Sequence, residues 1–469
     1  MLSSPAIDYL ALAPILILAA GACIGVLAAA FKLPRGGHVA LAVVSIVAAL
    51  AAIIHNAGSG LEAAQGLLTL DDAGYVMSAT LLLFGLLAVI LYRPREPEVY
   101  PLTVFSLLGM MIFIHSSNLL MLFVALEVFS LPLYIMCCLD RYRLKISQEA
   151  ALKYFFLGCF AAAFMLYSIV LIYAETGTLD YTSASGIGAI FVLVGLVFKM
   201  GVVPFHVWVP DVYQGAPTPV TAFMAIATKL AAVAATARFL TLVDAKFILP
   251  ILLALAMLSM FYGGIVAIAQ NDVKRLIAYS SIGHAGFILT ALIGAGAGQF
   301  TIGGFTFSAA TAAWVYLLAY GFATIGAFAL VTSVRAPHGA ENDGAEANSF
   351  AAWSGLGRTN PWLAAAMTVF FLSFAGIPAT AGFVGKLVAF SVPWLVGFPW
   401  LVVVALVASA VAAFAYFRFI ALLYFGTPGA RSVAVPAPAG LLIAVCVLAT
   451  VGLGLFPGSL ASLMAATGL

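Results

Sequence analysis

Long apolar segments alternate with short polar ones along the whole chain. Fourteen of them approach or exceed the length of about 20 apolar residues that an α-helix needs to cross a bilayer. These segments lie near residues 8–30, 38–55, 73–92, 100–115, 117–139, 148–173, 186–208, 218–241, 247–269, 273–296, 305–334, 360–391, 395–425 and 436–457. The pattern predicts an all-α polytopic membrane protein of about 14 transmembrane helices, with residues 1–469 forming a single membrane domain.

The composition supports a membrane location. Hydrophobic residues make up 65% of the 469 residues and charged residues only 8%, whereas soluble domains carry roughly a quarter charged residues. So few charges could not cover the surface of a water-soluble fold. The net charge of +2 gives no indication of nucleic-acid binding.

The positive residues are distributed unevenly between alternate loops. Thirteen of the 19 lie in or near loops that follow odd-numbered segments: Lys32, Arg35, Arg93, Arg95, Arg141, Arg143, Lys145, Lys274, Arg275, Arg335, Arg358, Arg418 and Arg431. Only Arg238 and Lys246 lie near loops after even-numbered segments. Because cytoplasmic loops carry the excess of Lys and Arg, both termini are expected on the outer side.

The remaining positive residues fall inside apolar segments. They are Lys153, Lys199, Lys229 and Lys386, and Glu127 is the acidic residue that falls well inside a segment. A lipid-facing charge costs several kcal/mol, so intramembrane charges face the protein interior or water and mark ion or proton pathways. Lys153 lies only a turn or two inside its predicted helix, and for this residue the alternative is that its side chain snorkels to the membrane surface.

Two apolar segments are interrupted beside a lysine. In residues 197–219, Pro204 follows Lys199 and breaks the helix, because proline removes a helix hydrogen bond. In residues 372–386, a proline and three glycines precede Lys386. Two interrupted helices five segments apart indicate a transporter built from inverted repeats. We expect a hydrated polar site at each break.

Three motifs carry a resemblance to a known family. They are PFHxWxPDVYxGAPTP (residues 204–219), NDVKRLIAYSSIGHAG (residues 271–286) and AGIPxTAGFxGK (residues 375–386). With these motifs the chain resembles the antiporter-like membrane subunits of respiratory complex I, the proton-pumping NADH:quinone oxidoreductase. The resemblance covers roughly residues 100–425.

Among these paralogues the chain is most similar to the N-type subunits. The sequence DVYQG at residues 211–215 favours that type. The M and L types, and the cation/proton antiporter subunits, usually have a histidine where Ala225 stands and no lysine at the position of Lys229.

The resemblance implies a bundle of fourteen helices with internal symmetry. Residues 1–99 would form three N-terminal helices, and residues 100–242 the first five-helix repeat. Residues 243–425 would form the second, inverted repeat, and residues 426–469 the last helix. The seventh and twelfth helices would be discontinuous.

The resemblance also assigns site residues, position by position. The family's glutamate and lysines match Glu127, Lys153, Lys199, Lys229 and Lys386, and a family histidine matches His284. His206 and His284 are candidate proton relays, because histidine titrates near neutral pH; the alternative for both is a hydrogen-bonded residue at a helix end.

These residues suggest a mechanism of proton transfer. Lys199 would be the central proton carrier, and Glu127, possibly together with Lys153, would form the ion pair that sets its proton affinity. Two unit charges about 8 Å apart at an effective dielectric constant of about 20 interact by roughly 2 kcal/mol, so that movement of Glu127 would change this affinity. Lys229 and Lys386 would continue the path.

The resemblance places the redox chemistry outside this chain. The five cysteines form no C-x-x-C motif, and no nucleotide-binding loop is present. No cofactor is therefore expected here; FMN, Fe–S clusters and the quinone site would lie in partner subunits. The expected partners are other membrane-arm subunits, including antiporter-like paralogues, in a bacterial inner membrane. The chain would be a translocase subunit without redox chemistry of its own.

Two related functions and one unrelated function stay open on the residues alone. A subunit of a multi-subunit cation/proton antiporter, or of a membrane-bound hydrogenase, would share the fold. An antiporter would show sodium-gradient-driven proton flux without NADH. A purely structural membrane scaffold is the third alternative, and the charged residues inside the apolar segments argue against it.

Overall fold

The computed structural model describes most of the chain. The described residues are 8–58, 66–92, 97–140, 143–184, 186–243, 245–302, 305–337, 345–458 and 460. Arg93, Arg95 and Arg141, which contribute to the charge pattern of the loops, lie outside these residues.

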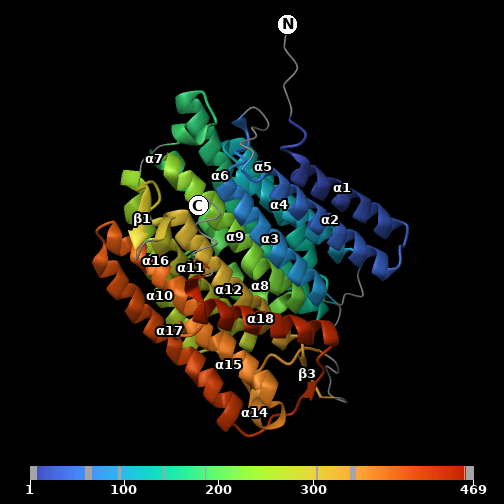
Figure 1. The fold of residues 1–469 in the computed structure, drawn as a ribbon. Helices are drawn as coiled ribbons and strands as arrows, with labels where there is room; N and C mark the ends of the chain where they lie inside the picture. Colours follow the sequence, from blue (N-terminus) through green and yellow to red (C-terminus); the bar gives the residue numbers. More distant parts are fainter. Residues whose placement is uncertain are drawn as a thin grey trace.

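The structure is a bundle of α-helices (Figure 1). The helices are α1 (Ala13–Ala30), α2 (Arg35–Asn56), α3 (Asp72–Leu91), α4 (Val99–His115), α5 (Leu119–Cys137), α6 (Leu144–Thr176), α7 (Gly186–Met200), α8 (Trp208–Gly215), α9 (Thr218–Leu242), α10 (Ala245–Ile268), α11 (Val273–Leu292), α12 (Ala309–Val331), α13 (Phe350–Trp353), α14 (Leu356–Thr359), α15 (Pro361–Ala375), α16 (Ala381–Leu395), α17 (Pro399–Phe425) and α18 (Ala437–Leu455). Every predicted segment contains a helix. Among the described residues, ten helices are long and apolar enough to span a bilayer, and α4, α7, α15 and α16 are shorter apolar helices. The predicted fold class, an all-α polytopic membrane protein, is confirmed.

Two short antiparallel pairs of strands lie at opposite ends of the bundle (Figure 1). Strand β1 (Gln299–Ile302) pairs with β2 (Phe305–Ser308), and β3 (Val334–Arg335) pairs with β4 (Ser432–Val433). The prediction of a helix from residue 305 was therefore wrong by four residues. The β2 segment is rich in Phe and Thr, which favour strands, and Ser308 then begins α12 with a capping box.

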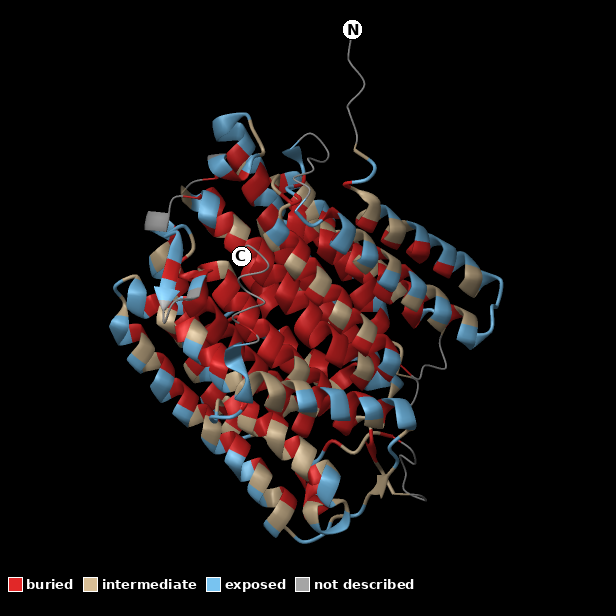
Figure 2. Ribbon diagram, viewed as in Figure 1, coloured by how far each residue is buried: buried red, intermediate tan, exposed pale blue. Residues whose placement is uncertain are grey.

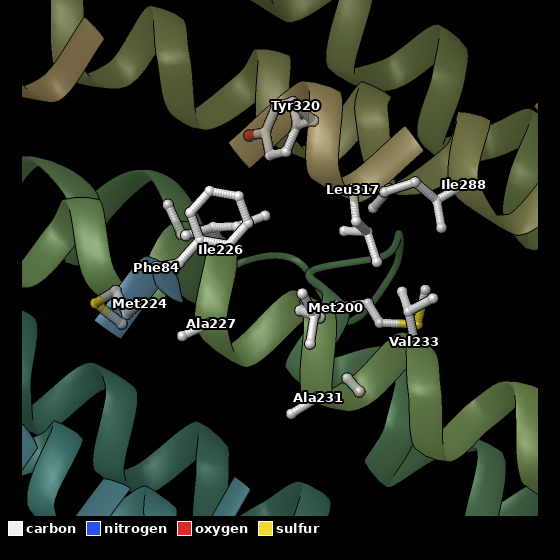
Figure 3. Packing of buried hydrophobic residues seen from close by; sticks show 14 of the residues in the cluster. Phe84, Met200, Met224, Ile226, Ala227, Ala231, Val233, Ile288, Leu317 and Tyr320 are labelled. Carbon is white, nitrogen blue, oxygen red and sulfur yellow. The ribbon is translucent and has the colours of Figure 1, made fainter. Parts of the chain in front are cut away.

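Helices α9 and α12 form the centre of the bundle. Their apolar stretches are 100% and 94% buried, whereas α1 and α18 are only 28% buried, as the colours of Figure 2 show. Alanine and other small residues along α9 allow the neighbouring helices to approach closely. In Figure 3, Phe84 of α3 lies beside Ile226 of α9, and Leu317 of α12 lies beside Ile288 of α11.

The outer faces of the bundle are apolar. Large hydrophobic side chains such as Phe160 (62% exposed) and Leu406 (56%) point outward, and pale blue residues line the outer helices in Figure 2. Exposed apolar surface of this extent is typical of a protein surrounded by lipid or by other subunits.

Both predicted breaks are present. Helix α7 ends at Met200, the next residue Gly201 has φ +74°, and the chain becomes helical again at Trp208 in α8. Helix α15 ends at Ala375, Gly376 has φ +82°, and α16 begins at Ala381. The two discontinuous helices predicted from the sequence are therefore confirmed.

Candidate functional site

Lys199 lies in an aromatic cage. It is the penultimate residue of α7, and only 1% of it is exposed. The centres of four aromatic rings lie 5.0 to 5.5 Å from its Nζ atom: Phe129, Tyr134, Tyr154 and Phe198. Aromatic faces attract an ammonium group. The hydroxyl oxygen of Tyr134 accepts a long hydrogen bond of 3.5 Å from Nζ.

Glu127 forms no close ion pair in the described part of the chain. It lies on α5, is half-buried, and among the described residues has no cationic nitrogen within 4.0 Å. In this structure the Lys153 Nζ atom lies more than 4.0 Å from the Glu127 carboxylate, and it contacts other carboxylates.

Lys153 is paired elsewhere. Its side chain is 43% exposed, and Nζ lies 2.7 Å from carboxylate oxygens of both Glu149 and Asp211. Of the two alternatives given for Lys153, the structure favours the one in which its side chain reaches the membrane surface. Lys153 lies in the third turn of α6, close enough to the helix end for its side chain to reach the charged groups there.

Lys229 is held by a single residue of a neighbouring helix. It lies in the fully buried helix α9 and donates to both the carbonyl oxygen and the Oγ atom of Ser281 on α11, at 2.7 Å each. The hydroxyl groups of Ser281 and Tyr213 are 3.4 Å apart. The ring centre of Tyr320 lies 5.6 Å from the Lys229 Nζ atom.

His284 lies between Lys229 and the second break. Its Nδ1 atom is 2.6 Å from the hydroxyl of Tyr316, and its ring centre is 4.8 Å from that of Tyr320. Its Nε2 atom has no hydrogen-bond partner in the described part of the chain. A cavity of about 10 Å³ adjoins the ring and is also lined by Ser373 of α15 and Gly385 of α16, about the space that one water molecule needs.

Lys386 caps the end of the interrupted helix. Nζ donates to the carbonyl oxygens of Phe374 (2.9 Å) and Ala375 (2.8 Å) and to Oγ of Ser409 (2.7 Å). The last carbonyl groups of a helix lack partners and carry partial negative charge, which a cation complements. Gly376 permits this arrangement, because a Cβ atom there would lie 2.7 Å from Cδ of Lys386.

His206 lies at the first break, in the turn between α7 and α8. It is buried, and its ring lies edge-on to Tyr262 with ring centres 4.5 Å apart. The carbonyl of Phe198 in this break accepts from Nε1 of Trp208 at 3.0 Å, so Lys199 does not cap its half-helix as Lys386 does.

Two charged clusters were not predicted from the sequence. Asp211 bridges Lys153 and Arg275, at 2.7 and 2.9 Å. Lys274, which was counted in or near a loop, lies at the start of α11 and is completely buried. It donates to the carbonyl oxygen of Ala216 (2.7 Å) and lies 3.5 Å from Glu346. Asp211 and Lys274 both lie inside the sequence motifs noted above, and this position was the signal that could have identified them. Glu346 lies in a polar loop and gave none.

The comparisons with known proteins agree with this architecture. The sequence pattern of the NADH:quinone oxidoreductase/Mrp antiporter transmembrane family matches residues 116–412. NADH-quinone oxidoreductase subunit N of Rhodococcus opacus (strain B4) is 40% identical to this chain, covering 97% of it and 94% of the relative. Subunit N 3 of Streptomyces griseus is 39% identical, covering 97% and 93%.

Solved structures show the same fold. A chain of respiratory complex I from Thermus thermophilus with bound aureothin superposes with a TM-score of 0.83 at 35% identity, covering 96% of this chain and 98% of that chain. A chain of the Mrp complex from a Dietzia species has the same TM-score at 19% identity, covering 98% and 97%, and this likeness concerns the fold alone.

The helical bundle, with its two broken helices, therefore defines an antiporter-like transmembrane subunit. The chain belongs to the NADH:quinone oxidoreductase/Mrp antiporter family, within the subunit N group of NADH-quinone oxidoreductase. The resemblance recognised in the three motifs is confirmed.

Proposed function

We propose that this chain translocates protons in the membrane arm of NADH:quinone oxidoreductase, driven by redox chemistry in partner subunits. One observation carries the proposal: Lys199, Lys229 and Lys386 are buried on three different helices, and no carboxylate of the described residues lies within 4.0 Å of any of them. A buried ammonium group without a counterion costs several kcal/mol unless its charge can be neutralised. Lysines placed in this way are suited to releasing and regaining a proton.

The groups around the lysines suggest the route between them. From Lys229 the polar groups continue through Ser281 and Tyr320 to His284, whose partner Tyr316 lines the small cavity beside the second break. Lys386 lies behind that break. One water in the cavity would link His284 to the backbone of α15 and α16, and His284 is then the relay.

Lys199 is the central carrier in this proposal. Its aromatic cage supplies attraction without a fixed carboxylate, and the nearby charge of Glu127 adjusts its proton affinity from a distance. His206, at the break that follows Lys199, is the second relay candidate.

We further propose the domain division and orientation that the sequence suggests. Residues 100–242 and 243–425 are the two inverted repeats, flanked by residues 1–99 and 426–469. Each repeat then contains one interrupted helix, α7–α8 or α15–α16. Both termini lie on the periplasmic side of a bacterial inner membrane. FMN, Fe–S clusters and quinone belong to partner subunits, and antiporter-like paralogues are the neighbours in the membrane.

The proposal is tested with a Lys199→Ala variant of the assembled complex in inverted membrane vesicles. The expected result is a several-fold loss of proton pumping per NADH oxidised. A Lys32→Gln variant, at an exposed position in the turn between α1 and α2, is the matched control and should pump normally. A native gel stained for NADH dehydrogenase activity shows that each variant assembles. Undiminished pumping by Lys199→Ala would overturn the role of Lys199.

A further inference from the structure

Four charged side chains gather where α6, α8 and α11 meet. The Lys153 ammonium contacts Glu149 and Asp211, both at 2.7 Å, and Asp211 also accepts from Arg275 at 2.9 Å. The proposed route through the buried lysines does not include this cluster. The distribution of Lys and Arg between the loops predicts that this cluster lies on the cytoplasmic side of the membrane.

Asp211 divides its two oxygens between two helices. Oδ2 accepts from Lys153 on α6, and Oδ1 accepts from Arg275 on α11. Gln214, one turn further along α8, also accepts from Arg275 at 3.0 Å. Asp211 itself lies on α8, directly after the first break. The position of Lys153 is therefore tied to the position of this short half-helix.

The cluster borders an open cavity. This cavity of about 730 Å³, which we call the vestibule, is lined by residues that include Lys145, Glu149, Lys153 and Asp211. The side chains of Lys153 and Asp211 are 43% and 33% exposed. Ion pairs in such a setting are individually weak, so Lys153 can exchange one carboxylate for another at small cost.

We propose that Asp211 is a positioning residue that holds Lys153 in the vestibule and away from Glu127. Movement of α8 at the break, or loss of the Asp211 charge, releases Lys153 toward Glu127 and changes the field that Glu127 exerts on Lys199. This inference rests on the proposed function. It adds Asp211 to Glu127 as a functional carboxylate partner of Lys153, and it identifies α8 as the element whose movement displaces Lys153.

Glu149 cannot serve the same purpose, although it contacts Lys153 equally closely. It lies one turn before Lys153 on the same helix, so it moves together with Lys153 and does not sense α8. Its side chain is also 63% exposed. The remaining charged groups that face the cluster are Lys145 of α6, which also lines the vestibule, and Asp272 of α11, which accepts a hydrogen bond from Gln214.

The test is a double-mutant cycle with the pH dependence of proton pumping as its readout. The variants are Asp211→Asn, Lys153→Gln, the double variant and Glu149→Gln as the matched control, each in the assembled complex in inverted vesicles. Asp211→Asn is expected to shift the pH midpoint of pumping per NADH by roughly half to one pH unit. In the Lys153→Gln background it should produce no further shift, and Glu149→Gln should produce a smaller one.

Several outcomes would overturn the inference. An unchanged profile for Asp211→Asn, or an equal shift in the presence and absence of Lys153, would show that Asp211 does not act through Lys153. If Asp211→Asn fails to assemble, Asp211→Glu replaces it in the cycle. Its longer side chain displaces the carboxylate, so a smaller shift that depends on Lys153 is expected.

The failure of this inference can be distinguished from the failure of the proposed function. If Lys199→Ala abolishes pumping while Asp211→Asn is silent, only the role of Asp211 falls. If Lys199→Ala pumps normally, the proton path itself is wrong, whatever the cycle shows.

Discussion

Replacing Glu346 by glutamine should destabilise the subunit, because Glu346 is the principal counterion of a buried lysine. Lys274 is completely buried, and its Nζ atom lies 3.5 Å from the Glu346 carboxylate, whose side chain is only 9% exposed. The Thr218 hydroxyl donates to this carboxylate, and Arg143 lies 3.6 Å away. Removing one partner of a buried ion pair costs about 3–5 kcal/mol, since it leaves an uncompensated charge.

The structure places the expected cost near the lower end of that range. In the Glu346→Gln variant, Lys274 keeps its hydrogen bond to the Ala216 carbonyl at 2.7 Å. Glutamine is almost isosteric and still accepts from the Thr218 hydroxyl, so packing and hydrogen bonding are largely retained. The loss is therefore mainly electrostatic, and we expect about 3 kcal/mol.

The assay is thermal inactivation of the assembled complex in mild detergent, followed by a native gel stained for NADH dehydrogenase activity and probed for this subunit. Glu346→Gln should dissociate at a clearly lower temperature than the wild type. Glu175→Gln, at an exposed position near the end of α6, is the matched control and should behave as the wild type. The double variant Glu346→Gln/Lys274→Gln should recover part of the loss, because no buried charge remains unpaired.

Two results would refute this reasoning. One is a Glu346→Gln variant that is as stable as the wild type. The other is a double variant whose destabilisation equals the sum of the two single variants, since independent effects would mean that the two groups do not form a coupled pair.

Three further predictions follow from individual contacts. Burial raises the pKa of Glu346, but nearby cations and the Thr218 hydroxyl outweigh burial and hold that pKa below its ordinary value. The contribution of Glu346 to stability is therefore complete above about pH 4.3 and is lost on acidification below that pH. Acid-induced dissociation of the complex on native gels measures this loss. Gly376→Ala should destabilise by about 1–3 kcal/mol and more than Gly177→Ala, because both have positive φ but only the former meets a side chain at 2.7 Å; thermal dissociation compares them, and equal losses would contradict the contact. Tyr154→Leu removes an aromatic ring whose centre lies 5.0 Å from the Lys199 Nζ atom. Because the ring attracts the ammonium form of Lys199, proton pumping should fall more at mildly alkaline than at mildly acidic pH. An equal loss at the two pH values would contradict a role of the aromatic cage.

The sequence alone determines the architecture in outline. Apolar segments of the required length, and glycine and proline at the two breaks, are local properties that neighbouring helices do not change. For the same reason the burial of Lys199, Lys229 and Lys386 could be predicted: each lies well inside an apolar segment, where charge is tolerated only in the protein interior.

Only the tertiary structure decided the partners of the charged residues. Lys153 lies inside an apolar segment but reaches Asp211 at the open vestibule, whereas Lys274 lies at the edge of an apolar segment but is completely buried. The carboxylate of Glu346, 72 residues away along the chain, lies 3.5 Å from the Lys274 Nζ atom. Hydropathy reports how apolar a segment is, whereas the side of a helix that is covered, and the residue that covers it, depend on contacts between segments distant in sequence.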